Sequence, residues 1–533
     1  MSLRRLIKYV TGASPPEENA AVFDELQDMG SELHRTMQEM ELISKRALSR
    51  HAYETCKVFP EELEPLATAR RTQLRDEARR ALLASRSLGR EERVLETQRI
   101  IESVGGALPV YEEVMAELVR QHAANLALVG RMPDGLALLE QVLAQFRSRI
   151  GCFNRLYGLL LQEYGRFLHL AEQLEPSARA LLEATDVLVL AEGPHARSTL
   201  VSLENLGQVL HATRSLDRAL ESYDRLCAWL EELSDVDETR DRLPQAWLSR
   251  ASVRFDLGDL EGGRRDAERS LEAFRAAGAA KTRQVADALS VLARIHDEEG
   301  DVGSAETRYR ESIALMDTPE FTNLTGTAWT HLQLARLLLR EGRAELAWPH
   351  VQVARSVYER EGWDQKPLFA AVEDATARCL YAAGQIEQAV VHARRGLDVA
   401  RSSMGERSQF SVAHASNLGV LLMEHGELAE ATRLLEWALE LLRERPTPHV
   451  EAEGMVQCNL ALVAERAGDL AKARELLEAS RDKVNEAHGP VVLGNLLRVL
   501  RALGSSGAQA LAEARVHELP PTPLMAMPEL RAA

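Results

Sequence analysis

Four arginines stand at matching positions of a pattern that repeats along this chain, and their side chains suit carboxylate binding. They are Arg166, Arg294, Arg336 and Arg378. A guanidinium group binds a carboxylate through two parallel hydrogen bonds, so a ladder of such groups predicts an acidic peptide or a C-terminal carboxylate as the ligand. The alternative is that each arginine pairs with a nearby acid, for example Arg378 with Asp374, or Arg294 with Asp297 or Glu298.

Three asparagines in an Asn-Leu-Gly or Asn-Leu-Ala sequence form a second candidate set. They are Asn205, Asn417 and Asn459. An amide side chain carries one acceptor and two donor hydrogens, which suits recognition of main-chain groups. The alternative is a hydrogen bond between helices of the array. Trp329 and Tyr381 are candidate apolar anchors for a bound segment, and each is equally compatible with a place in the core.

The sequence carries no pattern typical of catalysis. It lacks GxGxxG, GxxxxGK[ST] and GxSxG, and no HExxH occurs among its 15 histidines. His169 and His211 lie 42 residues apart, but a metal site needs further ligands, so we interpret them as polar residues facing a groove. The 5 cysteines are scattered, with no CxxC. We therefore expect no enzyme activity, cofactor or metal.

Small residues recur along the chain at a period of 42 residues, with a single step of 44. This series indicates the helices that position the candidate residues. The small residues are Ala123, Gly165, Gly207, Ala251, Ala293, Ala335, Ala377, Gly419 and Ala461. A second series follows twelve residues later, as Gly135, Ser177, Ala219, Gly263, Ala305, Ala347, Ala389, Ala431 and Ala473. Nine small residues in nine positions would arise by chance less than roughly once in a million trials, so the repeat is real.

Each repeat has the pattern of two amphipathic helices joined by a turn. In the unit 411–443, apolar residues recur at spacings of three and four on both sides of Gly426, which marks the turn. Gly419 and Ala431 let the two helices approach closely where they cross. Two units have Glu172 and Arg214 where the others have the turn glycine, so we expect those two turns to be built differently.

This small–turn–small series resembles the tetratricopeptide repeat (TPR) family over residues 109–485. The 42-residue period and the Asn-Leu-Gly/Ala signature resemble the longer-helix subtype of kinesin light chains and their bacterial relatives. The resemblance implies an all-α fold, with about nine helix pairs stacked into an α-solenoid, a right-handed superhelix. The first helices of the pairs would line a concave groove that holds a partner's segment. It also implies that an asparagine at the position of Asn205, Asn417 and Asn459 binds the backbone of an extended peptide.

The flanks of the repeats are expected to be helical or extended. Residues 1–15 form a short basic amphipathic segment, which either docks on a membrane or partner or lies against the next helices. Residues 16–108 have the pattern of a helical bundle, with helices over 16–55, 61–87 and 91–104. Residues 486–518 are expected to cap the array. Residues 519–533 hold four prolines and are expected to form a flexible tail, a docking motif or a segment lying in the chain's own groove.

The overall charge favours a protein partner. The net charge of −17 argues against nucleic acid, whose phosphates need clustered cations. No apolar run reaches the ~20 residues that span a bilayer, and no secretory signal is visible, so we expect a cytoplasmic protein. Arginine outnumbers lysine 57 to 7, which is typical of a GC-rich genome and predicts a bacterial source. The leading hypothesis is a non-catalytic scaffold with a peptide or protein segment in the groove. The alternative is a structural subunit that self-associates or assembles through 16–108 and the convex faces.

Overall fold

The computed structural model describes residues 65–104, 113–149, 154–233, 242–278, 282–318, 325–444, 449–485, 488–505 and 523–525. These residues form α-helices and connecting turns, with no strand among them, which confirms the predicted all-α class. The chain divides into two compact units, 1–257 and 258–533. The predicted segment 1–15, the predicted helix 16–55 and the predicted cap 508–518 lie outside the described residues.

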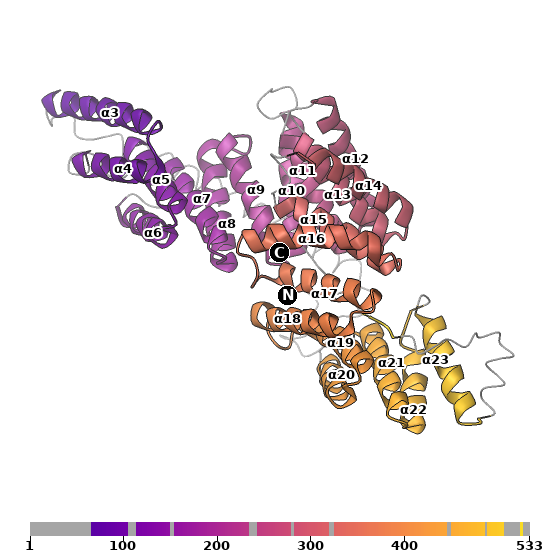
Figure 1. Cartoon of the computed structure of the whole chain (residues 1–533). Helices are drawn as coiled ribbons and strands as arrows, with labels where there is room; N and C mark the ends of the chain where they lie inside the picture. Colours follow the sequence, from indigo (N-terminus) through magenta and orange to yellow (C-terminus); the bar gives the residue numbers. More distant parts are fainter. Residues whose placement is uncertain are drawn as a thin grey trace, which may run out of the picture. The chain divides into compact units, whose positions relative to one another are not determined.

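Unit 1 contains the first nine described helices. They are α3 (Pro65–Ser85), α4 (Arg90–Val104), α5 (Glu113–Leu128), α6 (Met132–Arg149), α7 (Arg155–Leu170), α8 (Leu174–Glu192), α9 (Arg197–Ala212), α10 (Leu216–Glu232) and α11 (Arg242–Leu257). Each helix packs on the next, and α3, α5, α7, α9 and α11 also contact one another in that order (Figure 1). The pair α3 and α4 therefore stacks on α5 in the same way that one repeat stacks on another.

Unit 2 continues the same order of packing. Its helices are α12 (Leu260–Ala276), α13 (Thr282–Glu298), α14 (Val302–Met316), α15 (Thr325–Arg340), α16 (Ala344–Arg360), α17 (Pro367–Ala382), α18 (Ile386–Met404), α19 (Gln409–His425), α20 (Leu428–Arg443), α21 (Val450–Arg466), α22 (Leu470–Arg481) and α23 (Gly489–Ala502). The odd-numbered helices α13 to α21 are the first helices of their pairs, and each contacts the next. Helix α23 packs on α22 and adds Val492, Leu496 and Leu500 to the last apolar cluster.

The small residues lie at the helix crossings, as predicted. A Cβ atom added to Gly419 would come within 2.7 Å of Cγ of Leu435 on the paired helix. The same addition to Gly165 would come within 2.7 Å of Cγ of Leu181. In that pair the Ser177 hydroxyl, from the second series, donates a hydrogen bond of 2.6 Å to the Gly165 carbonyl. The 42-residue period is therefore a packing requirement, because larger side chains would separate the helices.

The prediction about the two turns without glycine was wrong. Gly130 has φ 80° and Gly426 has φ 95°, and Glu172 and Arg214 adopt the same left-handed region at φ 60° and 62°. The hydrogen bonds also match, because the amide after the turn residue donates to the carbonyl five residues back, both at Gly426 and at Glu172. The tertiary packing thus imposes one turn on every unit, and two non-glycine residues accept backbone strain to fit it.

Candidate functional site

The predicted arginine ladder of unit 2 forms around buried partners of the chain itself. Arg336 on α15 is half-buried, and its Nη1 donates to Oε1 of Gln333 at 3.1 Å. Burial, together with the smaller effect of the charge of Arg378 on α17, lowers the pKa of Arg336 to about 10, and the buried carboxylate of Asp374 opposes both. Burial likewise lowers the pKa of Arg378 against the effect of Asp374. The charge of Asp374 thus acts on two of the ladder's arginines.

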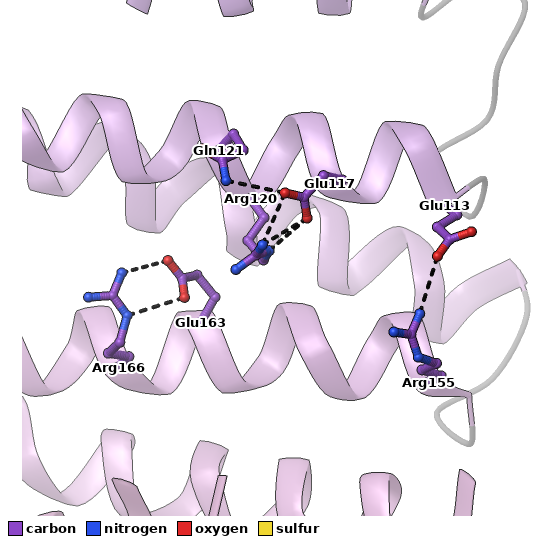
Figure 2. Close-up of polar contacts among 7 residues, drawn as sticks. All are labelled: Glu113, Glu117, Arg120, Gln121, Arg155, Glu163 and Arg166. Atoms are coloured by element: carbon purple, nitrogen blue, oxygen red, sulfur yellow. Dashed lines mark hydrogen bonds and ion pairs between the residues drawn. The ribbon is translucent and has the colours of Figure 1, made fainter. Parts of the chain in front are cut away.

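The other two predicted arginines are also engaged within the chain. Arg294 acts electrostatically, together with Arg336, on the buried hydroxyl of Tyr309, whose pKa burial raises. Arg166, in unit 1, donates from Nη2 to Oε1 of Glu163 at 2.6 Å (Figure 2). Its guanidinium also lies over the Phe167 ring, 4.8 Å from the ring centre.

The three predicted asparagines differ in what they bind. Asn417 on α19 donates from Nδ2 to Oδ1 of Asp374 on α17 at 2.7 Å. Asn459 on α21 donates to Oγ of Ser416 on α19 at 3.4 Å, again 43 residues back. Asn205 on α9 is half-buried and has no hydrogen-bond partner among the described residues.

Asn459 also binds the backbone of the chain's own C-terminal segment. Its Nδ2 donates to the carbonyl oxygen of Leu524 at 2.7 Å, and the Leu524 amide donates to its Oδ1 at 2.8 Å. This is the pattern that the family resemblance implied for an asparagine holding an extended peptide. Residues 523–525, within the predicted tail, are thus seated on α21.

The remaining candidates have structural neighbours. Trp329 and Tyr381 are each partly buried against a core cluster. His211 pairs with Asp256 at 2.9 Å, and burial lowers the pKa of His169. No cluster of three or more potential metal ligands occurs in the described part of the chain. No helix in that part has both the length and the apolar character needed to cross a bilayer.

A pocket in unit 1 was not anticipated from the sequence. It has a volume of about 650 Å³ and is bounded by α3, α5, α7 and the start of α9. Its apolar lining comes from leucine, valine and alanine side chains, which are Leu82, Val114, Ala116, Leu156, Leu159, Leu160, Ala196 and Val201. The first helices of successive pairs thus enclose a cleft with an apolar surface, which suits a bound side chain.

Charged side chains border the same pocket. Arg120 pairs with Glu117 at 2.9 Å on α5, and Arg155 on α7 reaches Glu113 at 3.4 Å (Figure 2). Arg155 also pairs with Glu192 at 2.5 Å. Two further lining arginines, Arg79 on α3 and Arg197 on α9, are exposed and have no ion-pair partner among the described residues. Neither arginine stands at a repeat position that the sequence pattern singles out, so sequence reasoning did not identify them.

Asn205 lies on α9 one helical turn beyond the lining of this pocket. It follows the lining residue Val201 by four positions, so the two share one side of the helix. Asn417 and Asn459 each bond to the residue 43 positions earlier in the chain. For Asn205 the residue 43 positions earlier is Gln162, which lines the pocket. Asn205 thus occupies the register of Asn459 beside an open cleft.

Comparison with known proteins identifies the repeat. Family models described as tetratricopeptide repeat match residues 242–318 and 412–445. The second match covers the crossing of Gly419 with Leu435 described above. The chain therefore contains tetratricopeptide repeats. A search of curated proteins found no match to this TPR protein.

Solved structures with similar helix arrangements are distant from this TPR protein. BtubC (BKLC) from P. vanneervenii is 22% identical, with 46% of this chain and 92% of that one covered and a TM-score of 0.35. A putative kinesin light chain repeat protein from Podosopora anserina is 21% identical, with 36% and 93% covered and a TM-score of 0.30. The Rap conjugation regulator of plasmid pLS20, in complex with the Phr* peptide, is 12% identical, with 70% and 94% covered and a TM-score of 0.44. These similarities do not determine what this TPR protein binds.

Proposed function

We propose that this chain is a non-catalytic scaffold that holds an extended segment of a partner protein in the unit 1 pocket. The observation that carries the proposal is a cleft of about 650 Å³ with an apolar surface and two arginines, Arg79 and Arg197, that lack acidic partners among the described residues. An unpaired guanidinium at a cleft favours a carboxylate ligand. The partner segment therefore carries an acidic side chain or a free C-terminal carboxylate.

Asn205 supplies the main-chain contact in this proposal. Asn459, in the same register of its own repeat, binds both backbone groups of Leu524 with one amide. The amide of Asn205 offers the same donor and acceptor next to the cleft. Recognition thus divides between sequence-independent backbone bonds at Asn205 and charge selection at Arg79 and Arg197.

A peptide array probed with the full-length chain tests this division. We expect acidic peptides to be retained over neutral and basic ones. Arg79→Glu with Arg197→Glu should invert that preference, whereas Asn205→Ala should weaken retention of all peptides several-fold without changing the preference. Arg179→Glu is the matched control, because Arg179 is exposed on α8 and does not line the pocket. The proposal fails if the wild-type chain shows no acidic preference, or if Arg179→Glu inverts it equally.

The alternative function, a structural subunit assembling through 16–108, rests on a different observation. Leu83 on α3 and Leu95 on α4 are 58% and 69% exposed over the described residues. Such side chains at one end of a helical stack favour contact with another apolar surface. Light scattering on Leu83→Lys with Leu95→Lys should then show a smaller particle than the wild type, while Leu182→Lys on α8 should not. An unchanged mass would remove this alternative.

A further inference from the structure

The C-terminal segment 523–525 occupies a second part of the inner surface, in unit 2. Leu524 is 5% exposed and belongs to the apolar cluster that contains Met455 and Cys458 of α21 and Leu496 of α23. Met525 packs against the neighbouring cluster, which draws on α19 and α21. The segment therefore lies on α21 and α23 and packs against a cluster that includes residues of α19.

The contacts of this segment are those of a bound extended peptide. Both polar bonds join its main chain to one side chain, Asn459, so no helix or strand ladder of the fold includes it. Pro523 has no amide hydrogen and fixes φ near −65°, which favours an extended chain before the leucine. Specificity rests on one buried leucine and on the thioether of Met525. Any chain with the same extended shape and side chains can make these contacts.

The segment 523–525 packs on a stretch of α21 that is buried throughout. Residues 454–464 of this helix are all buried, whereas α9 at the same register leaves Gln208 exposed and Glu204 and Asn205 half-buried. On α21 the buried Asn459 bonds both backbone groups of Leu524, and Leu524 is itself buried among residues of α21 and α23, so the chain's own segment contributes to the burial of this surface.

We propose that the inner surface of α19, α21 and α23 is a second peptide site, and that residues 523–525 are its exchangeable internal ligand. Its external ligand is an extended segment of the Pro-Leu-Met kind, which enters when the chain's own segment leaves. This inference extends the proposed scaffold function to a second surface and does not depend on the unit 1 pocket. Because residues 523–525 are tethered to the site, they compete with an external peptide at an effective concentration on the order of millimolar. A peptide that binds the site weakly is therefore largely excluded.

Binding of a labelled peptide with the sequence of residues 519–533 tests the proposal on the full-length chain. The variant Leu524→Asp releases the internal ligand, and fluorescence anisotropy should show at least tenfold tighter binding of the peptide than to wild type. Adding Asn459→Ala should weaken that binding at least tenfold. Asn417→Ala is the matched control, because it removes an equivalent interhelical bond without contacting 523–525, and it should change the affinity less than twofold.

Two outcomes overturn the inference. The first is peptide binding that Leu524→Asp does not tighten, or that Asn459→Ala does not weaken. The second needs no variant: hydrogen exchange of the Leu524 amide should be at least a hundredfold faster than that of the α21 amides, and equal rates would make the segment a fixed part of the fold. Should circular dichroism show that Leu524→Asp is unfolded, Met525→Asp replaces it. The charge reversals Arg79→Glu and Arg197→Glu should leave every one of these results unchanged. Failure of the unit 1 proposal therefore does not imply failure of this one, and the reverse also holds.

Discussion

Asn417 donates from Nδ2 to Oδ1 of Asp374 at 2.7 Å, and this bond joins the first helices of two successive repeats. Both residues are buried, and the same carboxylate acts on Arg336 and Arg378. The inner surface of unit 2 is therefore held together at this point by a network of charged and amide groups. Because the charge of Asp374 already acts on these two arginines, we expect an external acidic ligand in unit 1 rather than here.

Loss of the Asn417 amide should weaken the contact between α17 and α19. Asn417→Ala removes a hydrogen bond to a buried carboxylate, and the expected cost is about 2 kcal/mol. Native-state hydrogen exchange of the α17 and α19 amides measures the local opening free energy. Asn205→Ala is the control, since Asn205 has no partner among the described residues, and its cost should stay below about 0.5 kcal/mol. Equal costs at the two positions would contradict the network.

Backbone strain at Glu172 predicts that glycine stabilises this turn. Glu172 holds φ 60°, a region that costs a side-chain-bearing residue about 1 kcal/mol or more, so Glu172→Gly should raise the local stability of α7 and α8 by about that amount. The reverse change, Gly426→Ala, should lower the stability of α19 and α20 similarly. A Cβ atom at Gly426 meets nothing within 4 Å, so only conformation is affected. Hydrogen exchange at both turns measures the effects, and a destabilising Glu172→Gly would refute the explanation.

The crossing at Gly419 predicts a different kind of loss. A Cβ atom there would lie 2.7 Å from Cγ of Leu435, so Gly419→Val must displace Leu435 or separate α19 from α20. We expect a cost of about 1–3 kcal/mol, typical of overpacking. The double change Gly419→Val with Leu435→Ala should recover part of it, as thermal melting followed by circular dichroism would show. No recovery in the double variant would mean that the crossing is not set by these two side chains.

A histidine pair gives unit 2 a pH dependence. His331 on α15 and His350 on α16 place their Nδ1 atoms 2.9 Å apart. Burial and the charge of His350 lower the pKa of His331 to about 4, and burial and Arg310 lower the pKa of His350. In the unfolded chain the pKa of each histidine is near 6.5, so between pH 6.5 and pH 4 the unfolded chain binds more protons than the folded one. The free energy of unfolding is therefore at its full value above about pH 6.5 and falls as the pH is lowered toward 4.

The variant His331→Gln checks this sign. Glutamine keeps a hydrogen-bonding group beside His350 and does not titrate, so the melting temperature of the variant should decline less than that of wild type between pH 6.5 and 4. Melting curves at half-unit pH steps provide the measurement. Parallel declines in the two proteins would show that other groups control the acid response.

The sequence predicts the helices and their crossings well because both depend on local, repeated requirements. Gly419 can face Leu435 only if the side chain is absent, and a glycine or alanine recurs at this position in every repeat. The turn at Glu172 could not be predicted correctly from residue type, because the packing of the helix pair overrides the backbone preference of glutamate.

The site is less predictable because partners come from different helices. Arg336 fits a ladder by its spacing, yet its acid, Asp374, is supplied by the next first helix. Arg79 and Arg197 stand 118 positions apart in the sequence and border one cleft only after α3, α5, α7 and α9 stack. The bond between Asn459 and Leu524 spans 65 residues and follows no period.

Site-specific photo-crosslinking tests the central claim, capture of a partner in the unit 1 pocket, most directly. A benzophenone amino acid replaces Leu159, which lines the pocket, or Leu182, which is exposed on α8 outside it. Irradiation in the native cells followed by mass spectrometry should yield an acidic partner segment attached at position 159 and none at position 182. Crosslinks at 182 with none at 159 would contradict the claim and move binding away from the first helices.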